Sequence, residues 1–327
     1  MRKVGLAVLF VSVALGQDID RVFRLKNAAA VISVQEIATT MRTVALIPKL
    51  SVDNASATLT IKGTPDQMAL AEWLLPKLDV AEASNLGPQE HRVQGSSDDV
   101  VMVFELAHAT TIQGIQEIIT TLRTVANIQK IFTVTAPRIV TLRGDASQIA
   151  LAKFLVLELD QAAQSRQNAM VHEFKSDGGR LETTVVYGLA HTDSPQSTQE
   201  IITTLRTVLN IQKLFSVTAP KLLAMRGSAI DVQMAEWLIP ELDRQTANLT
   251  GNEARVPGGN DDVVHVFYLT HVTTPAGING LFTDIRRTTH MTNAFLHSVP
   301  ATLIFRGTAD QIATAGRMIE LSDRAAP

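Results

Sequence analysis

Histidine is the residue type in this sequence that is best placed for metal chemistry. His108, His191 and His271 each follow a strand-like run at the same place in a repeated pattern, and Asn27 takes that place in the first copy. Zinc sites need three or four ligands that converge on one point. Because each histidine belongs to a different copy of the repeat, we predict polar residues that close a strand, and no metal site.

Other residues that could support catalysis do not form a recognisable pattern. The sequence contains no cysteine and no G-x-S-x-G, H-E-x-x-H or phosphate-binding glycine motif. The acidic pairs Asp98-Asp99 and Asp261-Asp262 lack the ligand spacing of a calcium loop, which favours solvated turns. We predict no catalytic residues and no cofactor, and therefore a protein that is not an enzyme.

Arginine recurs in all four copies beside the apolar stripe of a predicted helix. Its stem can lie along the edge of a core with the guanidinium in water, or the side chain can contact another unit or subunit. The second interpretation makes these residues candidates for an interaction surface: Arg42, Arg123, Arg206 and Arg286.

The repeat itself is defined by three anchors that align without a gap. A leucine follows the first strand-like run, a glycine after a basic residue comes 38 positions later, and an aspartate comes 16 positions after the glycine. Spacing this regular indicates duplicated structural units. The anchors are Leu25, Gly63 and Asp79; Leu106, Gly144 and Asp160; Leu189, Gly227 and Asp243; and Leu269, Gly307 and Asp323.

Within a unit, the apolar pattern changes from strand-like to helical and back. In the second unit, Ile115, Ile118, Ile119 and Leu122 form one stripe of an amphipathic helix. Two short strands follow around a turn such as Thr135-Ala136-Pro137, and a capped second helix ends the unit. The predicted fold class is α+β, with four tandem βαββα modules, each a small sheet with two helices on one face.

Polar linkers separate the predicted modules. Each linker ends in a short run that can pair with the next first strand across a Gly/Asp turn, such as Ala254-Arg255-Val256. The predicted organisation is a signal peptide at 1–16, module 1 at 17–80, module 2 at 90–161, module 3 at 170–244 and module 4 at 253–324.

The third strand of each module has one face that points away from the helices. In module 1 this face carries Thr58, Thr60 and Lys62 and is polar. In later modules it becomes partly apolar, and leaving Leu or Ile in water forgoes about 1.5–3 kcal/mol for each side chain. We predict that linker residues cover the apolar members or that these lie on an exposed patch used for assembly: Ile139, Leu222 and Ile304.

The composition is that of an exported globular protein. Arg2 and Lys3 precede an apolar run at 4–15, and small residues around Gly16 suit cleavage, which predicts a signal peptide and a mature chain without a transmembrane span. A net charge of −3 argues against nucleic acid as a partner. A cysteine-free exported chain fits a bacterial periplasm or cell surface.

The order and spacing of the unit resemble the periplasmic N-terminal modules of secretins, the outer-membrane pore proteins of secretion and pilus systems. The matching pattern is strand-Leu, helix, a hairpin ending in basic-Gly, and a helix ending in Leu-Asp at Leu78-Asp79, Leu159-Asp160 and Leu242-Asp243. The fourth unit departs from it at Leu321-Ser322-Asp323. The resemblance implies a KH-like, ring-building βαββα fold that packs subunits side by side. A secretin pore domain does not follow these modules in this sequence.

These observations predict a non-enzymatic exported scaffold or adaptor that acts through protein–protein contacts, with protein partners or self-association. The alternative is a module that binds an envelope ligand or a peptide in grooves between the repeats. A concave pocket between modules would favour the alternative, and flat junctions would disfavour it.

Overall fold

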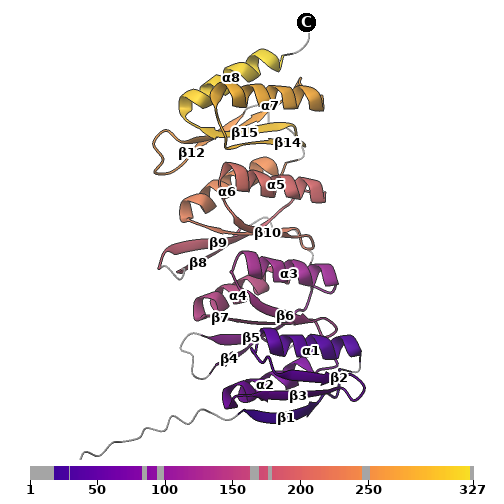
Figure 1. The fold of residues 1–327 in the computed structure, drawn as a ribbon. Coiled ribbons are helices and arrows are strands. Elements are labelled where there is room, and N and C mark those ends of the chain that lie inside the picture. Colours follow the sequence, from indigo (N-terminus) through magenta and orange to yellow (C-terminus); the bar gives the residue numbers. More distant parts are fainter. Residues whose placement is uncertain are drawn as a thin grey trace, which may run out of the picture.

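The computed structural model describes residues 18–28, 30–82, 87–93, 99–162, 169–175, 179–244 and 251–324. The predicted signal peptide at 1–16 lies outside this part of the chain, as does Asp98. The described residues form four mixed α/β modules, each with two helices on one face of a small antiparallel sheet (Figure 1). The predicted fold class is confirmed.

The element bounds repeat from module to module. Module 1 contains β1 (Ile19–Arg24), α1 (Val31–Thr43), β2 (Leu50–Asp53), β3 (Thr58–Gly63) and α2 (Pro65–Leu78). Module 2 contains β4 (Gln89–Arg92), β5 (Val100–Glu105), α3 (Ile112–Thr124), β6 (Lys130–Val134), β7 (Ile139–Gly144) and α4 (Ala146–Leu159). Module 3 contains β8 (Met170–Lys175), β9 (Leu181–Gly188), α5 (Pro195–Val208), β10 (Lys213–Val217), β11 (Leu222–Gly227) and α6 (Ala229–Leu242). Module 4 contains β12 (Asn252–Arg255), β13 (Val263–Tyr268), α7 (Pro275–Thr289), β14 (Ala294–His297), β15 (Thr302–Gly307) and α8 (Ala309–Ser322).

The sheets differ in one respect. Modules 2, 3 and 4 have four strands, because the linker strands β4, β8 and β12 pair with the outer edge of β5, β9 and β13. The strand order in module 2, for example, is β4-β5-β7-β6. Module 1 has three strands in the order β1-β3-β2. The predicted linker strands are therefore present, and β1 is an edge strand.

The second helix of every module begins with a capping box. The hydroxyl of Thr64 accepts a hydrogen bond from the backbone N–H of Gln67, whose side-chain oxygen accepts one from the backbone N–H of Thr64. Such reciprocal bonds satisfy two donors that a helix start leaves free. Asp145, Ser228 and Thr308 make the same arrangement in the other modules.

The closing aspartate of each repeat joins the end of the second helix to the loop after the first strand. In module 2 the carboxylate of Asp160 accepts hydrogen bonds from the backbone N–H groups of Ala107, His108 and Ala109, at 2.6, 2.9 and 2.8 Å. The same contacts recur at Asp79 and, with small changes, at Asp243 and Asp323. Charge-assisted bonds of this kind give the closing aspartate the same structural role in all four modules.

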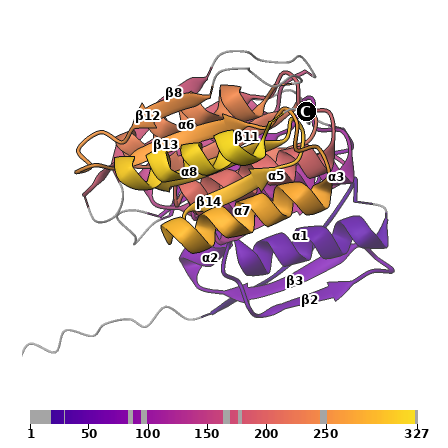
Figure 2. The ribbon, with the colours of Figure 1, turned by 90° about the horizontal axis from the view of Figure 1, so that it is seen from above.

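The modules stack in one direction, with the sheet of each module lying on the two helices of the module before it (Figure 1). The core of module 1 therefore includes Val101 and Val103 of module 2, and the core of module 2 includes Val186 of module 3. Seen along the stack, the first helices α1, α5 and α7 lie toward one side and the added strands β8 and β12 toward the other (Figure 2). No helix in the described ranges is long and apolar enough to cross a membrane.

Replacing Asp160 by asparagine tests the role of the closing aspartate. We expect Asp160→Asn to lower the free energy of unfolding by about 2 kcal/mol, because one amide oxygen replaces two carboxylate oxygens in front of three N–H donors. Urea denaturation measures the change, and amide exchange of His108 and Ala109 should accelerate. The exposed control Glu82→Gln should leave both unchanged. Equal stability of Asp160→Asn and the parent chain would contradict the assignment.

Candidate functional site

The apolar residues predicted to form an assembly surface lie between modules of the same chain. Ile139, Leu222 and Ile304 are 0%, 1% and 0% exposed. Each belongs to the core of the preceding module: module 1 for Ile139, module 2 for Leu222 and module 3 for Ile304. The strand register inferred from the sequence holds, but the covering surface is neither a linker nor another molecule. The helices of the preceding module cover these side chains.

A glutamate on the first helix of modules 1 to 3 accepts two hydrogen bonds from the turn between the second and third core strands of the next module. The carboxylate of Glu117 accepts hydrogen bonds from the backbone N–H and the hydroxyl of Thr218, at 2.8 and 2.6 Å. Glu36 binds Thr135 and Glu200 binds Ser298 in the same way. These two-point contacts set the lateral position of each sheet on the helices below it.

The sequence contains a signal for these junctions that our sequence-based reading missed. Glutamate is present at this position in modules 1 to 3, but module 4 has Gly280 there. The hydroxyl residue is present in modules 2 to 4, but module 1 has Asn54 there. The last module lacks the glutamate and the first module lacks the hydroxyl residue. Each junction needs the glutamate of one module and the hydroxyl residue of the next, so this pattern indicates a contact between neighbouring modules.

In modules 3 and 4, the basic residue before the anchor glycine also reaches the preceding module. The guanidinium of Arg226 donates a hydrogen bond to the backbone oxygen of Val125, just after the end of α3, at 3.0 Å, and it pairs with Glu182 of its own sheet. Arg306 repeats this arrangement with Val208, at 3.4 Å, and Asp262. Cations are favoured at the negative end of a helix dipole. The Asp262 side chain raises the pKa of Arg306, so this guanidinium stays charged.

Both ends of the stack lack the residues that make the inner junctions. At the end formed by module 1, the open sheet face carries Asp20, Lys62 and the 65% exposed Val22 instead of a continuous apolar surface. At the end formed by module 4, Arg317 stands where modules 1 to 3 have an aromatic residue, and Asp284 stands where they have a buried threonine. The aromatic residues are Trp73, Phe154 and Trp237, and the threonines are Thr40, Thr121 and Thr204. Modules 1 and 4 therefore act as capping repeats, whose outer faces are polar and do not accept a further module.

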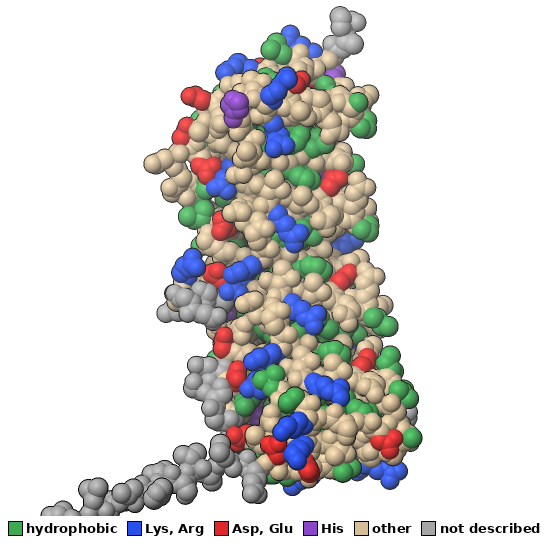
Figure 3. Space-filling view, in the orientation of Figure 1, with side chains coloured by type: hydrophobic (Ala, Val, Ile, Leu, Met, Phe, Trp, Pro, Cys, Tyr) green, Lys and Arg blue, Asp and Glu red, His purple; other side chains and the backbone are tan. Residues whose placement is uncertain are grey.

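Three of the four candidate arginines contact the free edge of their own sheet. Arg42 donates to the backbone oxygen of Leu50 in β2 at 3.0 Å, and Arg123 and Arg206 make the same bond to β6 and β10. Arg286 instead lies over the ring of Phe282, 5.6 Å from its centroid. Charged side chains on an edge strand hinder pairing with another sheet. Lys and Arg side chains appear at successive levels of the stack on the face shown in Figure 3.

The histidines at the repeated position do not converge. His108, His191 and His271 are exposed and lie in separate modules, and their backbone N–H groups bind the closing aspartates. No group of three metal-binding side chains occurs among the residues with a described position. In modules 1 and 4 the polar side chain at this position, Asn27 or His271, also contacts the backbone oxygen of the closing aspartate.

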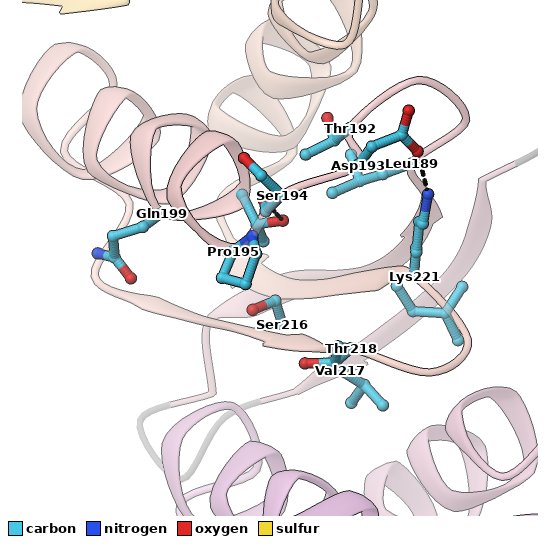
Figure 4. Close-up of a pocket in the computed structure, with 12 residues that line it drawn as sticks. Leu189, Thr192, Asp193, Ser194, Pro195, Gln199, Ser216, Val217, Thr218 and Lys221 are labelled. Carbon is cyan, nitrogen blue, oxygen red and sulfur yellow. Dashed lines mark hydrogen bonds and ion pairs between the residues drawn. The ribbon is translucent and has the colours of Figure 1, made fainter.

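One cavity of about 230 Å³ lies between the start of α5 and the turn that binds Glu117 (Figure 4). Its polar side chains are engaged within the protein: Lys221 pairs with Asp193 at 2.5 Å, and the Ser194 hydroxyl accepts a hydrogen bond from the backbone N–H of Ser197 as a helix cap. A serine fixed as a cap is a poor candidate nucleophile, because no base is placed to activate it.

The junction of modules 3 and 4 contains a buried histidine. His297 is 1% exposed and takes the place that Val134 and Val217 have in modules 2 and 3. Its Nε2 lies 3.8 Å from a carboxylate oxygen of Glu200, and neither ring nitrogen has a hydrogen-bond partner within the described part of the chain. Burial lowers the pKa of His297, and the Glu200 carboxylate and the nearby backbone oxygen of Pro300 only partly oppose this effect.

Comparison with known proteins gives no family assignment. No family model and no curated protein matches the chain. Among solved structures, it is similar to the N-terminal domain of the secretin XcpQ from Pseudomonas aeruginosa, with 14% identity over 44% of this chain and a TM-score of 0.19; the match spans 62% of that chain. It is also similar to Aeromonas hydrophila ExeD, with 15% identity over 89% of this chain and 59% of the other and a TM-score of 0.17. A protein of unknown function, APE0754 from Aeropyrum pernix, has 14% identity over 44% of this chain and 84% of its own, with a TM-score of 0.23.

A double-mutant cycle tests the hydrogen bonding between Glu117 of module 2 and Thr218 of module 3. We expect Glu117→Ala and Thr218→Ala each to destabilise that junction, with a coupling energy of about 1 kcal/mol, because Thr218→Ala removes the hydroxyl that donates to Glu117 and leaves the backbone N–H in place. Urea unfolding of the two single variants and the double variant measures the coupling. The control Glu320→Ala removes an exposed carboxylate of the terminal helix and should show no coupling with Thr218→Ala. Additive losses would show that the two groups do not interact.

Replacing His297 by valine tests the pH dependence of the module 3–4 junction. The pKa of His297 lies below its ordinary 6.5 in the folded chain, so the unfolded chain binds this proton more readily. The free energy of unfolding is therefore highest, as far as His297 is concerned, above about pH 6.5. It decreases as the pH falls from 6.5 toward the lower pKa of the folded chain. We expect His297→Val to remove this loss between pH 7.5 and 5.5, and to raise stability by about 1 kcal/mol at pH 7.5 by eliminating unpaired buried nitrogens.

The difference between the parent chain and His297→Val isolates this residue. Burial also lowers the pKa of His91 and His265, but both histidines are present in the two chains. Glu200 loses its stabilising charge only as the pH falls through its ordinary 4.5 and below, outside the tested window. Parallel stability curves for the two chains would refute the role of His297.

Proposed function

We propose that this chain is an exported, non-enzymatic scaffold or adaptor that acts through protein contacts on the sides of its four-module stack. The observation that carries the proposal is the polarity of the two end faces, with Lys62 and Asp20 at one end and Arg317 and Asp284 at the other. Charged residues interrupt the apolar surface of both end faces, that around Val22 included, so end-to-end growth lacks a continuous apolar surface and we assign contacts with other molecules to the sides.

The use of the repeated polar residues also supports a structural role. The closing aspartates, the junction glutamates and the edge arginines are all engaged by groups of the same chain. Modules that share cores with their neighbours are held in fixed positions along the stack, which suits a spacer or scaffold. The basic start and apolar run of residues 1–16 support export to a bacterial periplasm or cell surface.

Grooves between the repeats support the alternative less well. The space between modules 2 and 3 is filled by core residues such as Val217, Leu222 and Ala224. The cavity beside the start of α5 has about 230 Å³, less than the ~300 Å³ at which small-molecule pockets begin. An envelope ligand would therefore need a site elsewhere on the molecule.

Single-cysteine crosslinking tests the scaffold proposal, because the chain has no cysteine of its own. A thiol-specific crosslinker is attached to Ile112→Cys and Leu157→Cys, which replace exposed side-chain positions on the flanks, and to Thr60→Cys and Arg317→Cys at the ends. In the native host we expect defined protein adducts, or adducts with a second copy, from flank positions and none from end positions. Absence of adducts from every flank position, together with a monomer in sedimentation, would sink the proposal.

A further inference from the structure

Module 4 differs from the other modules in the groove between its second helix and its added strand. Three positions at this groove carry two glycines and a histidine that the other modules do not have there. They are Gly316 in place of Glu72, Lys153 and Glu236; His265 in place of Arg21, Met102 and Val185; and Gly251 in place of Pro88 and Ala169. Together these replacements remove side chains from the groove and place an imidazole in it.

A hollow of about 500 Å³ occupies this groove. The rings of Phe267 and His265, stacked with their centroids 3.9 Å apart, line the hollow from the sheet. Ile312, Ala313 and Gly316 line it from α8. Pockets for small ligands measure about 300–1,000 Å³ and combine apolar walls with a few polar groups. The hollow meets both conditions.

Both glycines keep the hollow open. A Cβ on Gly251 would lie 2.8 Å from Nε2 of His265 and 2.9 Å from the backbone oxygen of Val266, so a side chain at this position would displace the imidazole. At Gly316 a Cβ would meet only Cε1 of Phe267, at 3.6 Å, which is an ordinary contact. Packing therefore does not require a glycine at 316, although glycine inside a helix is destabilising relative to alanine.

The polar groups of the hollow leave a negative charge without a cation. Nδ1 of His265 lies 3.2 Å from a carboxylate oxygen of Glu253. Burial lowers the pKa of His265, and Glu253 only partly opposes this effect, so at neutral pH an uncharged imidazole donates to a charged carboxylate. Glu320 adds a second carboxylate to the lining. Arg317 also lines the hollow, but its guanidinium donates to the hydroxyl of Thr314, at 2.9 Å.

Module 2 shows which chemical group satisfies a carboxylate at this place. There Lys153, at the position of Gly316, reaches from α4 to the added strand, and its ammonium donates to Glu90 at 2.6 Å. Glu90 takes the position that Glu253 has in module 4. Module 4 thus keeps the carboxylate but has no side chain on the helix to reach it. The complement of the hollow is an ammonium group on an apolar stem.

We propose that the hollow of module 4 binds a small primary alkylammonium ligand, whose ammonium donates to Glu253 and whose stem lies between Phe267 and Gly316. Because Nδ1 of His265 donates to Glu253, Nε2 carries the lone pair and is a second acceptor for the ammonium. The proposal goes beyond the scaffold function and does not rest on it, since the lining residues all lie within 251–320 of one module.

Titration with pentylammonium tests the site. The probe has a stem like that of lysine, and pentan-1-ol and pentanoate provide the same stem with no charge and with a negative charge. Each is added to the full ¹⁵N-labelled chain at neutral pH, and the amide chemical shifts are followed. We expect saturable shifts at Gly251, Phe267 and Gly316 with pentylammonium, about tenfold or more weaker binding of pentan-1-ol, and no binding of pentanoate.

Two matched pairs of variants locate the binding. Glu253→Gln should weaken pentylammonium binding about tenfold, whereas Glu90→Gln should leave it unchanged, because Lys153 already fills the groove of module 2. Gly316→Lys should abolish binding by placing an ammonium of the chain in the hollow. The control Gly280→Lys adds the same charge on α7, where nothing lies within 4 Å of an added Cβ, and should retain binding. A cooperative melting transition shows that each variant is folded.

Four results would overturn the proposal. The first is absence of saturable shifts, and the second is equal affinity of pentylammonium and pentan-1-ol. The third is unchanged binding by Glu253→Gln or Gly316→Lys. The fourth is binding of the peptide acetyl-Ala-Lys-Ala-amide that is more than about tenfold tighter than that of pentylammonium, because the hollow would then suit a protein side chain better than a free amine. Crosslinking from the flank positions tests the scaffold function separately.

Discussion

Between each pair of modules, the outer face of one sheet packs on the two helices of the module before it. Val103, Ile139, Leu222 and Ile304 leave water in this way, at about 1.5–3 kcal/mol for each large side chain. A sheet with two helices on one face cannot bury its other face alone, so each inner module depends on its neighbour. Stability in such an array is a sum of module and junction contributions.

Polar contacts determine where these apolar layers meet. Apolar packing is not directional. Two hydrogen bonds from the N–H and the hydroxyl of one residue to a single carboxylate are directional. The contact of Glu117 with Thr218 therefore fixes a register that the surrounding Leu and Ile side chains would leave loose. Arg226 adds a second fixed point at the end of α3.

The array is directional, and its two ends differ in what they expose. The module 1 end presents a polar sheet face and an unpaired strand edge at β1, whereas the module 4 end presents a polar helix layer. The opposite sheet edge carries Arg42, Arg123 and Arg206 on its backbone oxygens, which hinders strand addition there. On the other side, the sheets end at β1 in module 1 and at the added strands β4, β8 and β12 in modules 2 to 4.

Sequence patterns alone were sufficient for the module, because its causes are local: helical periodicity, capping boxes such as Thr64 with Gln67, and gap-free spacing. They also identified Ile139, Leu222 and Ile304 as apolar residues that need a cover. Only the tertiary structure identified the cover as the preceding module, and showed that Glu36, Glu117 and Glu200 reach across each junction. These contacts join residues about a hundred positions apart, and periodicity within one module holds no information about how its neighbour is placed.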